Sequence, residues 1–362
     1  MPAPTVVRHA PGKLFVAGEY AVVEPGNPAI LVAVDRQVTV RASPGAGPQV
    51  VIRSDLSPEP VRLRWHEGRL SGDTHQAAYV AAAVQTVGSL LAERGLGPPG
   101  LELSVSSRLH ERGRKYGLGS SGAVTVATVA AVAAAAGLEL SRQARYRLAL
   151  LATAAIDAKS SGGDVAASTW GGWILYRAPD RAFVTDLARR VGLERALAAP
   201  WPGFEVRRLP PPAGLAFEVG WTGEPASTTA LVSGLHRRPW RGTAAHRRFV
   251  ESTGECVRAA AGALESGDRA ELLAQIRRAR GQLARLDQEV GLGIFTPKLT
   301  ALCDMAEAAG GAAKPSGAGG GDCGIALLDA AAPREIDEVR QRWAAAGVLP
   351  LPVGPALEGI EE

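Results

Sequence analysis

Alternating apolar and polar residues predict the strands of this chain. Apolar side chains occupy every second position from Leu101 to Val105, which is the period of a half-buried strand, here extending to about Leu109. Shorter apolar runs, some bounded by turn residues such as Gly26-Asn27-Pro28, predict the other strands. These are expected over residues 5–9, 14–17, 29–40, 49–53, 173–177, 215–221, 323–328 and 348–353.

Apolar residues at helical spacing predict helices over residues 73–93, 122–136, 141–158, 243–265, 268–290, 296–309 and 333–346. Ser141 is a typical N-cap residue at the start of one of them. The proline-rich stretch 199–214 is the best candidate for a linker. Strands and helices are mixed without strict alternation, which favours an α+β fold over a doubly wound sheet.

The length of the chain indicates two domains. A single hydrophobic core stops growing near about 250–300 residues, and this chain has 362 residues. We place the domains at residues 1–205 and 206–362, with the boundary inside the expected linker. Apolar content of 46% and charged content of 21% are ordinary for globular proteins.

Composition argues against several classes of partner. The net charge is only +4, and the arginine pairs have no interleaved aromatic residues, so we expect no nucleic acid. The apolar run 123–137 is mostly alanine and too short to span a bilayer, so we expect a buried helix and no membrane partner. Three cysteines without CxxC spacing favour neither a disulfide framework nor a zinc site. No signal peptide is recognisable either, so we expect a cytoplasmic protein. We expect it to be a monomer or a homodimer.

The distribution of lysine is the most informative chemical feature. Only five of the 40 basic residues are lysine, namely residues 13, 115, 159, 298 and 314. Four of the five lie in segments rich in small residues, at 10–20, 115–122, 159–164 and 314–322. A compact ammonium group suits phosphate binding, so this distribution predicts an enzyme that handles phosphate.

The segment from Leu109 to Gly122 predicts an anion-binding loop. It leads from a strand into a helix, where glycines let the backbone approach a ligand and free amides favour an anion. Ser120 and Ser121 add hydroxyl groups where a phosphate with bound Mg²⁺ would lie. The segment also matches GxGxxG, but seven residues separate strand from glycines and no acid follows at the expected distance, which weakens a dinucleotide-binding hypothesis. A purely structural glycine turn remains an alternative.

Lys13 and Asp164 each allow two interpretations. Lys13 follows Ala-Pro-Gly and precedes a strand. By itself it is either a surface lysine or a cation that interacts with a reacting phosphate. Asp164 follows Ser-Ser-Gly-Gly and is either a helix N-cap or a catalytic acid. Phosphoryl transfer needs cations, a metal and a carboxylate near the nucleophile, and the chain contains residues of these types.

Together, the segments 10–20, 117–121 and 317–321 resemble the three ordered motifs of the GHMP kinases. The motifs occur in the right order and span almost the whole chain. This resemblance implies an N-terminal domain like the second domain of ribosomal protein S5 and a ferredoxin-like C-terminal domain. Within the superfamily, residues 115–122, 220–227 and 314–324 are most similar to bacterial phosphomevalonate kinases.

The resemblance also implies roles for individual residues. Lys13 and Asp164 are the implied catalytic pair, and Ser121 is the implied ligand of Mg²⁺, the cofactor that accompanies ATP. The implied ATP-binding residues are Lys115, Gly117, Leu118, Gly119, Ser120, Ser121 and Gly122. The implied substrate-binding residues are Glu19, Tyr20, Lys159, Ser161, Ser227, Gly317, Ala318 and Gly319.

Two residues depart from the motifs of the family. Mevalonate kinases have a metal-binding glutamate eleven residues before the aspartate, and Thr153 stands there in this chain, so we assign no glutamate ligand. Gly113 replaces a motif proline, with Lys115 close by. Extra positive charge beside the loop suits an acceptor that is itself phosphorylated.

The resemblance implies ATP-dependent phosphorylation of 5-phosphomevalonate to 5-diphosphomevalonate, a step of isoprenoid biosynthesis. Mevalonate kinase is the nearest alternative, with an uncharged acceptor. A non-catalytic ligand-binding homologue is another, although the presence of both Lys13 and Asp164 argues against it. A nicotinamide-dependent oxidoreductase is the weakest, because it rests on GxGxxG alone.

Overall fold

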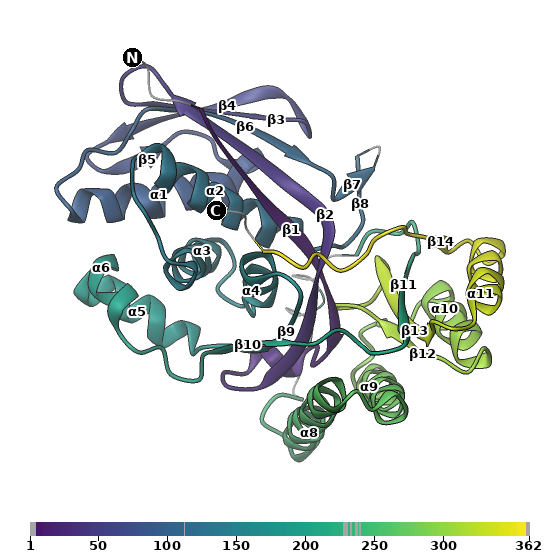
Figure 1. Cartoon of the computed structure of the whole chain (residues 1–362). Coiled ribbons are helices and arrows are strands. Elements are labelled where there is room, and N and C mark those ends of the chain that lie inside the picture. Colours follow the sequence, from purple (N-terminus) through teal and green to yellow (C-terminus); the bar gives the residue numbers. More distant parts are fainter. Residues whose placement is uncertain are drawn as a thin grey trace.

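The computed structural model describes residues 5–111, 113–226, 231, 234–235, 238 and 240–359. Two main sheets organise these residues, one of eight strands and one of four, and helices pack against each of them (Figure 1). The expected α+β fold is confirmed.

The first half of the chain forms the larger sheet and the helices beside it. Its strands are β1 (Val6–Ala17), β2 (Pro28–Pro44), β3 (Gln49–Ser54), β4 (Ser57–His66), β5 (Arg69–Ser71), β6 (Leu101–Ser107), β9 (Trp173–Arg177) and β10 (Glu205–Leu209). A small hairpin is made of β7 (His110–Glu111) and β8 (Arg114–Lys115). The helices are η1 (Ala21–Val23), η2 (His75–Ala77), α1 (Ala78–Glu93), α2 (Ser120–Ala135), α3 (Arg142–Ile156), α4 (Gly163–Trp170), α5 (Arg181–Val191) and α6 (Leu193–Ala198).

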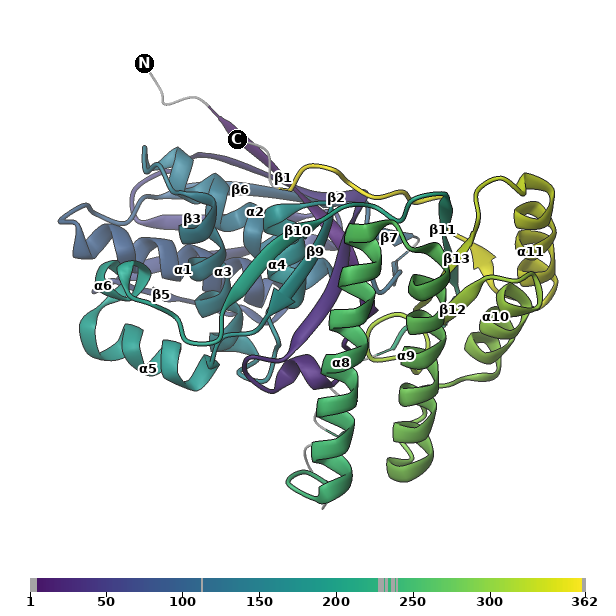
Figure 2. The same ribbon diagram turned by 60° about the horizontal axis from the view of Figure 1, so that its bottom comes forward.

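The second half forms the smaller sheet, in the strand order β12-β13-β11-β14. Its strands are β11 (Leu215–Trp221), β12 (Ala312–Pro315), β13 (Cys323–Asp329) and β14 (Leu349–Pro350). Its helices are α8 (Ala244–Ser266), α9 (Arg269–Val290), α10 (Pro297–Ala308) and α11 (Pro333–Ala345). The long helices α8 and α9 lie side by side (Figure 2).

Strand β2 is the central strand of the larger sheet. It pairs with β1 along almost its whole length, with β9 through residues 28–32 and with β6 through residues 38–44. The strand order is β10-β9-β2-β6-β3-β4-β5, and among the described strands of this sheet the neighbours β3 and β6 are parallel while the other pairs are antiparallel. This arrangement is not the parallel sheet of a dinucleotide-binding fold.

Helix α2 is buried almost all round, as its alanine-rich sequence predicts. It contacts β1 and β2 on the sheet and also α1, α3 and α4. A helix that is apolar on every side must lie inside the protein, and small alanine side chains let five neighbours approach it closely. The burial of α2 holds its N-terminus, where the predicted anion-binding loop ends, in one position.

The C-terminal segment returns to the larger sheet. The amide of Asp35 donates to the carbonyl of Gly354 at 2.9 Å, and the amide of Ala356 donates to the carbonyl of Ala33 at 2.8 Å. Figure 1 shows this segment in yellow, crossing from β14 toward β1. The first and last parts of the chain therefore stabilise each other, and the boundary between residues 205 and 206 stays a prediction.

Most predicted elements are present, with a few corrections. The expected strands 5–9 and 14–17 are one strand, β1, with an irregularity between Pro11 and Gly12. The expected linker 199–214 contains β10, which pairs with β9 at the edge of the sheet. No element was predicted at the strands β4, β5, β7, β8 and β12 or at the helices α4, α5 and α6.

Within the described ranges, no helix combines the length and the apolar character needed to cross a membrane. Cys256, Cys303 and Cys323 are buried free thiols.

A buried ion pair joins the two halves of the chain. The Nζ atom of Lys314 in β12 donates to Oε1 of Glu19, which follows β1, and also to the carbonyl of Pro315 at 2.7 Å. The Lys314 side chain is fully buried and that of Glu19 is 3% exposed. Two buried charges are tolerated only when they are paired, so this contact fixes β12 against the end of β1.

We predict that Lys314→Met lowers the free energy of unfolding by about 3–5 kcal/mol, because it leaves the Glu19 carboxylate buried without its partner. The matched control is Lys298→Met, since Lys298 pairs with Glu224 at a partly exposed position. That change should cost about 1 kcal/mol or less. Urea unfolding measures the free energy of unfolding of both variants. Equal decreases would show that the buried ion pair contributes no more to stability than the exposed one.

Candidate active site

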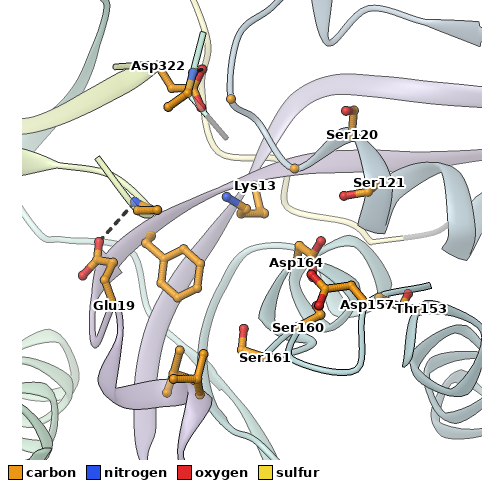
Figure 3. A pocket seen from close by; sticks show the side chains of 18 of the residues that line it. Lys13, Glu19, Ser120, Ser121, Thr153, Asp157, Ser160, Ser161, Asp164 and Asp322 are labelled. Atoms are coloured by element: carbon orange, nitrogen blue, oxygen red, sulfur yellow. Dashed lines mark hydrogen bonds between the residues drawn. The ribbon is translucent and has the colours of Figure 1, made fainter. Parts of the chain in front are cut away.

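A cavity of about 360 Å³ lies where four segments of the chain meet. They are the end of β1, the loop before α2, the connection from α3 to α4, and the segment after β12 (Figure 3). Among the predicted site residues, those that line it are Lys13, Glu19, Tyr20, Lys115, Gly117, Gly119, Ser120, Ser121, Lys159, Ser161, Asp164, Gly317 and Ala318. Leu118, Gly122 and Gly319 are not among the lining residues, and Ser227 is outside the described residues.

Strand β1 holds three of these segments in place. The amide of Lys13 donates to the carbonyl of Leu118 in the loop, at 2.8 Å. The hydroxyl of Ser168 in α4 donates to the carbonyl of Pro11 at 2.7 Å. Ser316, which follows β12, accepts from the amide of Phe15 at 2.8 Å and donates to its carbonyl at 3.0 Å.

Lys13 is a buried cation at the centre of the cavity, which excludes the surface-lysine interpretation. Its exposed fraction is 8%, and its Nζ lies 5.2 Å from the centre of the Phe15 ring. Burial lowers the pKa of Lys13, while the nearby charges of Asp164 and Asp322 act in the opposite direction. Among the described residues no carboxylate forms an ion pair with Lys13 within 4.0 Å, so it attracts Asp164 across a short gap.

The glycines of the loop are required by close contacts. Gly119 has a φ of 72° and is the N-cap of α2, and a Cβ there would lie 2.8 Å from Cε of Lys13. A Cβ on Gly117 would lie 2.4 Å from Cβ of Asp322. Ser120 and Ser121 are the first two residues of α2, so their hydroxyls and the free amides of the helix face the cavity together.

Asp164 lies in the first turn of α4, whose N-cap is Gly162, so the N-cap interpretation is wrong. Its Oδ1 accepts from the amide of Val165 at 2.9 Å, which helps to fix the carboxylate. Burial raises the pKa of Asp164, against the influence of Lys13. A Cβ on Gly122 would lie 2.7 Å from Cγ of Asp164, so helix α2 and the aspartate are in direct contact.

Glu19 and Tyr20 shape the wall of the cavity. The Glu19 carboxylate is engaged by Lys314, and Tyr20 donates its hydroxyl proton to the carbonyl of Ala318 at 2.5 Å. Lys314, one of the four lysines in the segments rich in small residues, is not part of the lining. Its role is structural, in contrast to those of Lys13, Lys115 and Lys159.

Several further residues line the cavity without having been predicted as site residues, and three of them, Asp322, Asp157 and Tyr79, are ionisable. Asp322 accepts from the amide of Ala226 at 3.1 Å, and burial raises its pKa. Asp157 ends helix α3, and its Oδ1 accepts from the amide of Lys159 at 3.0 Å. Tyr79, in the first turn of α1, has its pKa raised by burial. Asp322 ends the segment 314–322 and Asp157 lies two residues before the segment 159–164, which was a usable signal, whereas nothing in the sequence distinguishes Tyr79.

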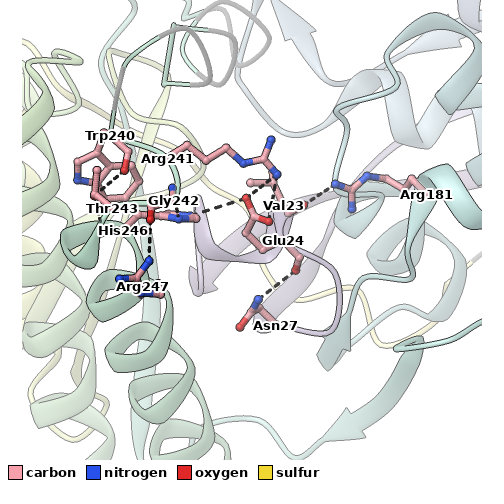
Figure 4. A network of polar contacts seen from close by, with 10 residues as sticks. All are labelled: Val23, Glu24, Asn27, Arg181, Trp240, Arg241, Gly242, Thr243, His246 and Arg247. Atoms are coloured by element: carbon pink, nitrogen blue, oxygen red, sulfur yellow. Dashed lines mark hydrogen bonds and ion pairs between the residues drawn. The ribbon is translucent and has the colours of Figure 1, made fainter.

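A polar network joins the two halves near the cavity (Figure 4). Arg241, ahead of α8, pairs with Glu24 at 2.9 Å, and His246 lies 3.7 Å from the same carboxylate. Val23, the neighbour of Glu24, lines the cavity and accepts a hydrogen bond from Arg181. This network therefore fixes the wall formed by η1.

The donor set of the cavity fits a hard divalent cation bound together with phosphate. Among the described residues, no group of three or more His, Cys, Asp or Glu side chains forms a metal site by itself. The lining does supply carboxylate and hydroxyl oxygens, which Mg²⁺ prefers. Mg²⁺ typically binds through one or two such groups and completes its shell with substrate phosphate and water.

Known proteins resemble this chain along its whole length. The family model of the GHMP kinases N terminal domain matches residues 78–172, and that of the GHMP kinases C terminal domain matches residues 260–346. The phosphomevalonate kinase of Streptomyces sp. (strain CL190) is 71% identical over 98% of this chain and 98% of its own. The mevalonate kinase of Pyrococcus horikoshii is 29% identical over 98% of this chain and 97% of its own. The solved structure of Streptococcus pneumoniae phosphomevalonate kinase in complex with phosphomevalonate and AMPPNP matches with a TM-score of 0.85 and 28% identity, over 97% of this chain and 99% of that one.

We predict that Lys13 titrates at lower pH than an ordinary lysine and that Asp164→Asn lowers its pKa further. The change removes the largest charge that favours the protonated amine, so the neutral form appears at lower pH. Asp322→Asn should have a smaller effect in the same direction. Nitrogen-detected NMR of the lysine Nζ atoms measures this, since the chain has only five lysines. An unchanged pKa of Lys13 in Asp164→Asn would contradict the electrostatic interaction between these two residues.

Proposed function

The chain belongs to the GHMP kinases, and from this premise we propose that it transfers the terminal phosphoryl group of ATP to (R)-5-phosphomevalonate, forming 5-diphosphomevalonate. This is a step of the mevalonate pathway of isoprenoid biosynthesis. The 71% identity to a phosphomevalonate kinase, against 29% to a mevalonate kinase, favours the phosphorylated acceptor.

The observation that carries the proposal is the convergence of Lys13, Lys115 and Lys159 on one cavity with the N-terminus of α2. Two anions must approach each other in this reaction, and their repulsion is the main obstacle. Three ammonium groups and the amides of a helix N-terminus reduce that repulsion. An uncharged acceptor would not need this much positive charge.

The loop before α2 is the proposed ATP phosphate site. The backbone of Gly117, Leu118 and Gly119 and the start of α2 would surround the phosphates, with Lys115 beside them. Ser121 would hold Mg²⁺, which neutralises charge on the transferred group when bound. The segment 317–319 and Lys159 with Ser161 border the space left for the acceptor.

Asp164 is proposed to position rather than to remove a proton. The second pKa of a phosphate monoester is about 6, so the attacking oxygen is already mostly anionic at neutral pH. The attraction between Asp164 and Lys13 instead orients the ammonium group toward the charge that develops during transfer. Lys13 then stabilises that charge directly.

We also infer the setting of the enzyme. Three buried free thiols suit a reducing compartment, so we place it in the cytoplasm. It would act as a monomer or a homodimer on two small molecules, without nucleic acid or membrane as partners.

We predict that the purified protein consumes ATP much faster with phosphomevalonate than with mevalonate, homoserine or galactose. Lys13, Lys115 and Lys159 in the lining can hold the phosphate group of phosphomevalonate as well as those of ATP, and the other three acceptors carry no phosphate. A coupled assay of ADP release with the four acceptors measures this. Equal or faster turnover of mevalonate would replace the proposal by a mevalonate kinase, and no turnover of any acceptor would favour a ligand-binding homologue.

We predict that Gly122→Ala lowers kcat by about 100-fold, because the new methyl group would displace the Asp164 carboxylate, and misplacement by about 1 Å can cost that much. The matched control is Gly262→Ala, one turn before the end of α8, where a Cβ meets nothing within 4 Å. That variant should keep its kcat and gain about 0.5–1 kcal/mol of stability. Similar kcat values for the two variants would contradict the contact between α2 and Asp164.

A further inference from the structure

A buried hydroxyl group without a partner lies next to the carboxylates of the cavity. Thr153 is 2% exposed and lines the cavity, and its Oγ1 has no hydrogen-bond partner among the residues that the structure describes. Most buried hydroxyl groups in proteins are hydrogen-bonded, and a threonine inside a helix can satisfy itself with the carbonyl four residues earlier. Two other buried threonines, Thr128 and Thr253, also lack a partner among the described residues, but of the three only Thr153 lines this cavity, where a ligand or an ordered water can reach its hydroxyl.

Asp157 lies one helical turn after Thr153, where α3 ends. Its amide donates to the carbonyl of Thr153 at 2.8 Å, and its Oδ1 accepts from the amide of Lys159 at 3.0 Å. These bonds fix the carboxylate at the helix end, where it lines the cavity. Figure 3 shows Thr153, Asp157 and Asp164 together on one side, with Ser121 above them.

The two carboxylates repel each other. Burial is the main cause of the raised pKa of Asp164, and the like charge of Asp157 adds to it; burial also raises the pKa of Tyr79, and Asp157 again adds to the effect. Lys13 lies on the other side of Asp164, toward Glu19 and Asp322, so its charge does not separate the two acids (Figure 3). A cation between Asp157 and Ser121 would relieve this repulsion.

We propose that Asp157 supplies a carboxylate oxygen to the magnesium ion that accompanies ATP, opposite Ser121, and that Thr153 binds a water molecule of the same ion. This proposal rests on the proposed function, because nucleotide phosphates complete the shell. The assignment fits the preference of Mg²⁺ for one or two protein oxygens with several retained waters. It gives Thr153 its missing partner.

Binding of Mn²⁺ as a paramagnetic substitute tests the assignment without any turnover. Electron paramagnetic resonance measures free Mn²⁺ in the presence of the protein and a non-hydrolysable ATP analogue. Asp157→Asn keeps an acceptor for the amide of Lys159 but removes the charge, and it should weaken Mn²⁺ binding about 10-fold to 100-fold. Nucleotide binding measured in a chelator without metal should stay the same.

Two comparison variants sharpen the test. Asp322→Asn removes a different carboxylate of the same cavity, near Gly117, and should leave Mn²⁺ affinity unchanged. Thr153→Glu added to Asp157→Asn places a carboxylate one turn earlier on the same helix face and should restore much of the affinity. If Asp157→Asn does not fold, Asp157→Ser tests the same charge.

Each outcome decides the proposal. Unchanged Mn²⁺ affinity in Asp157→Asn, or an equal loss in Asp322→Asn, overturns it. If Mn²⁺ binding depends on Asp157 but phosphomevalonate is not phosphorylated, the metal site stands and the proposed acceptor is wrong. If the unaltered protein binds no Mn²⁺ with the nucleotide analogue, both proposals are wrong.

Discussion

The main chain of residues 11–15 in β1 is hydrogen-bonded to three segments that are far apart in the sequence. The geometry of the site depends on these bonds. Leu118 of the loop, Ser168 of α4 and Ser316 after β12 each bind this short stretch directly. Because main-chain atoms cannot move independently of the strand, the three segments keep fixed positions around Lys13. Strand β1 is in turn fixed by its long pairing with β2.

The close approach of these segments to β1 also explains the glycines beside Lys13 and Asp164. Three segments meet within contact distance of one lysine side chain, and a Cβ on Gly119 or Gly122 would collide with Lys13 or Asp164. The glycines therefore serve close packing as well as the approach of a ligand.

The two lysines that are buried have different roles. Lys314 is neutralised by Glu19 in a closed contact that stabilises the protein, whereas Lys13 faces a cavity where its charge is available to a substrate.

The sequence was a good guide to the elements and to many of the residues that line the cavity, because both leave local signals. The apolar period predicted β6 and the long helices, and Ser141 caps α3 as expected, accepting from the amide of Ala144. The edge strand β10 was missed because prolines on both sides gave its segment the composition of a linker. Tyr79 enters the cavity only because α1 packs against α2 and α3, and that packing has no trace in the sequence around it.

The resemblance to a family predicted which residue types converge, but not how their charges are distributed. Lys314 belongs to a motif segment, and only its burial against Glu19 shows that it does not reach the cavity. Conversely, Asp322 and Asp157 are near motif residues without belonging to the assigned set, yet both carboxylates line the cavity. The acids of the cavity thus lie in two groups. The charges of Asp322 and Asp164 favour the protonated form of Lys13 and so raise its pKa, while the charge of Asp157, on the far side, raises the pKa of Asp164. Asp164 therefore lies between a cation and an anion of the protein, and both charges restrict where its carboxylate can lie.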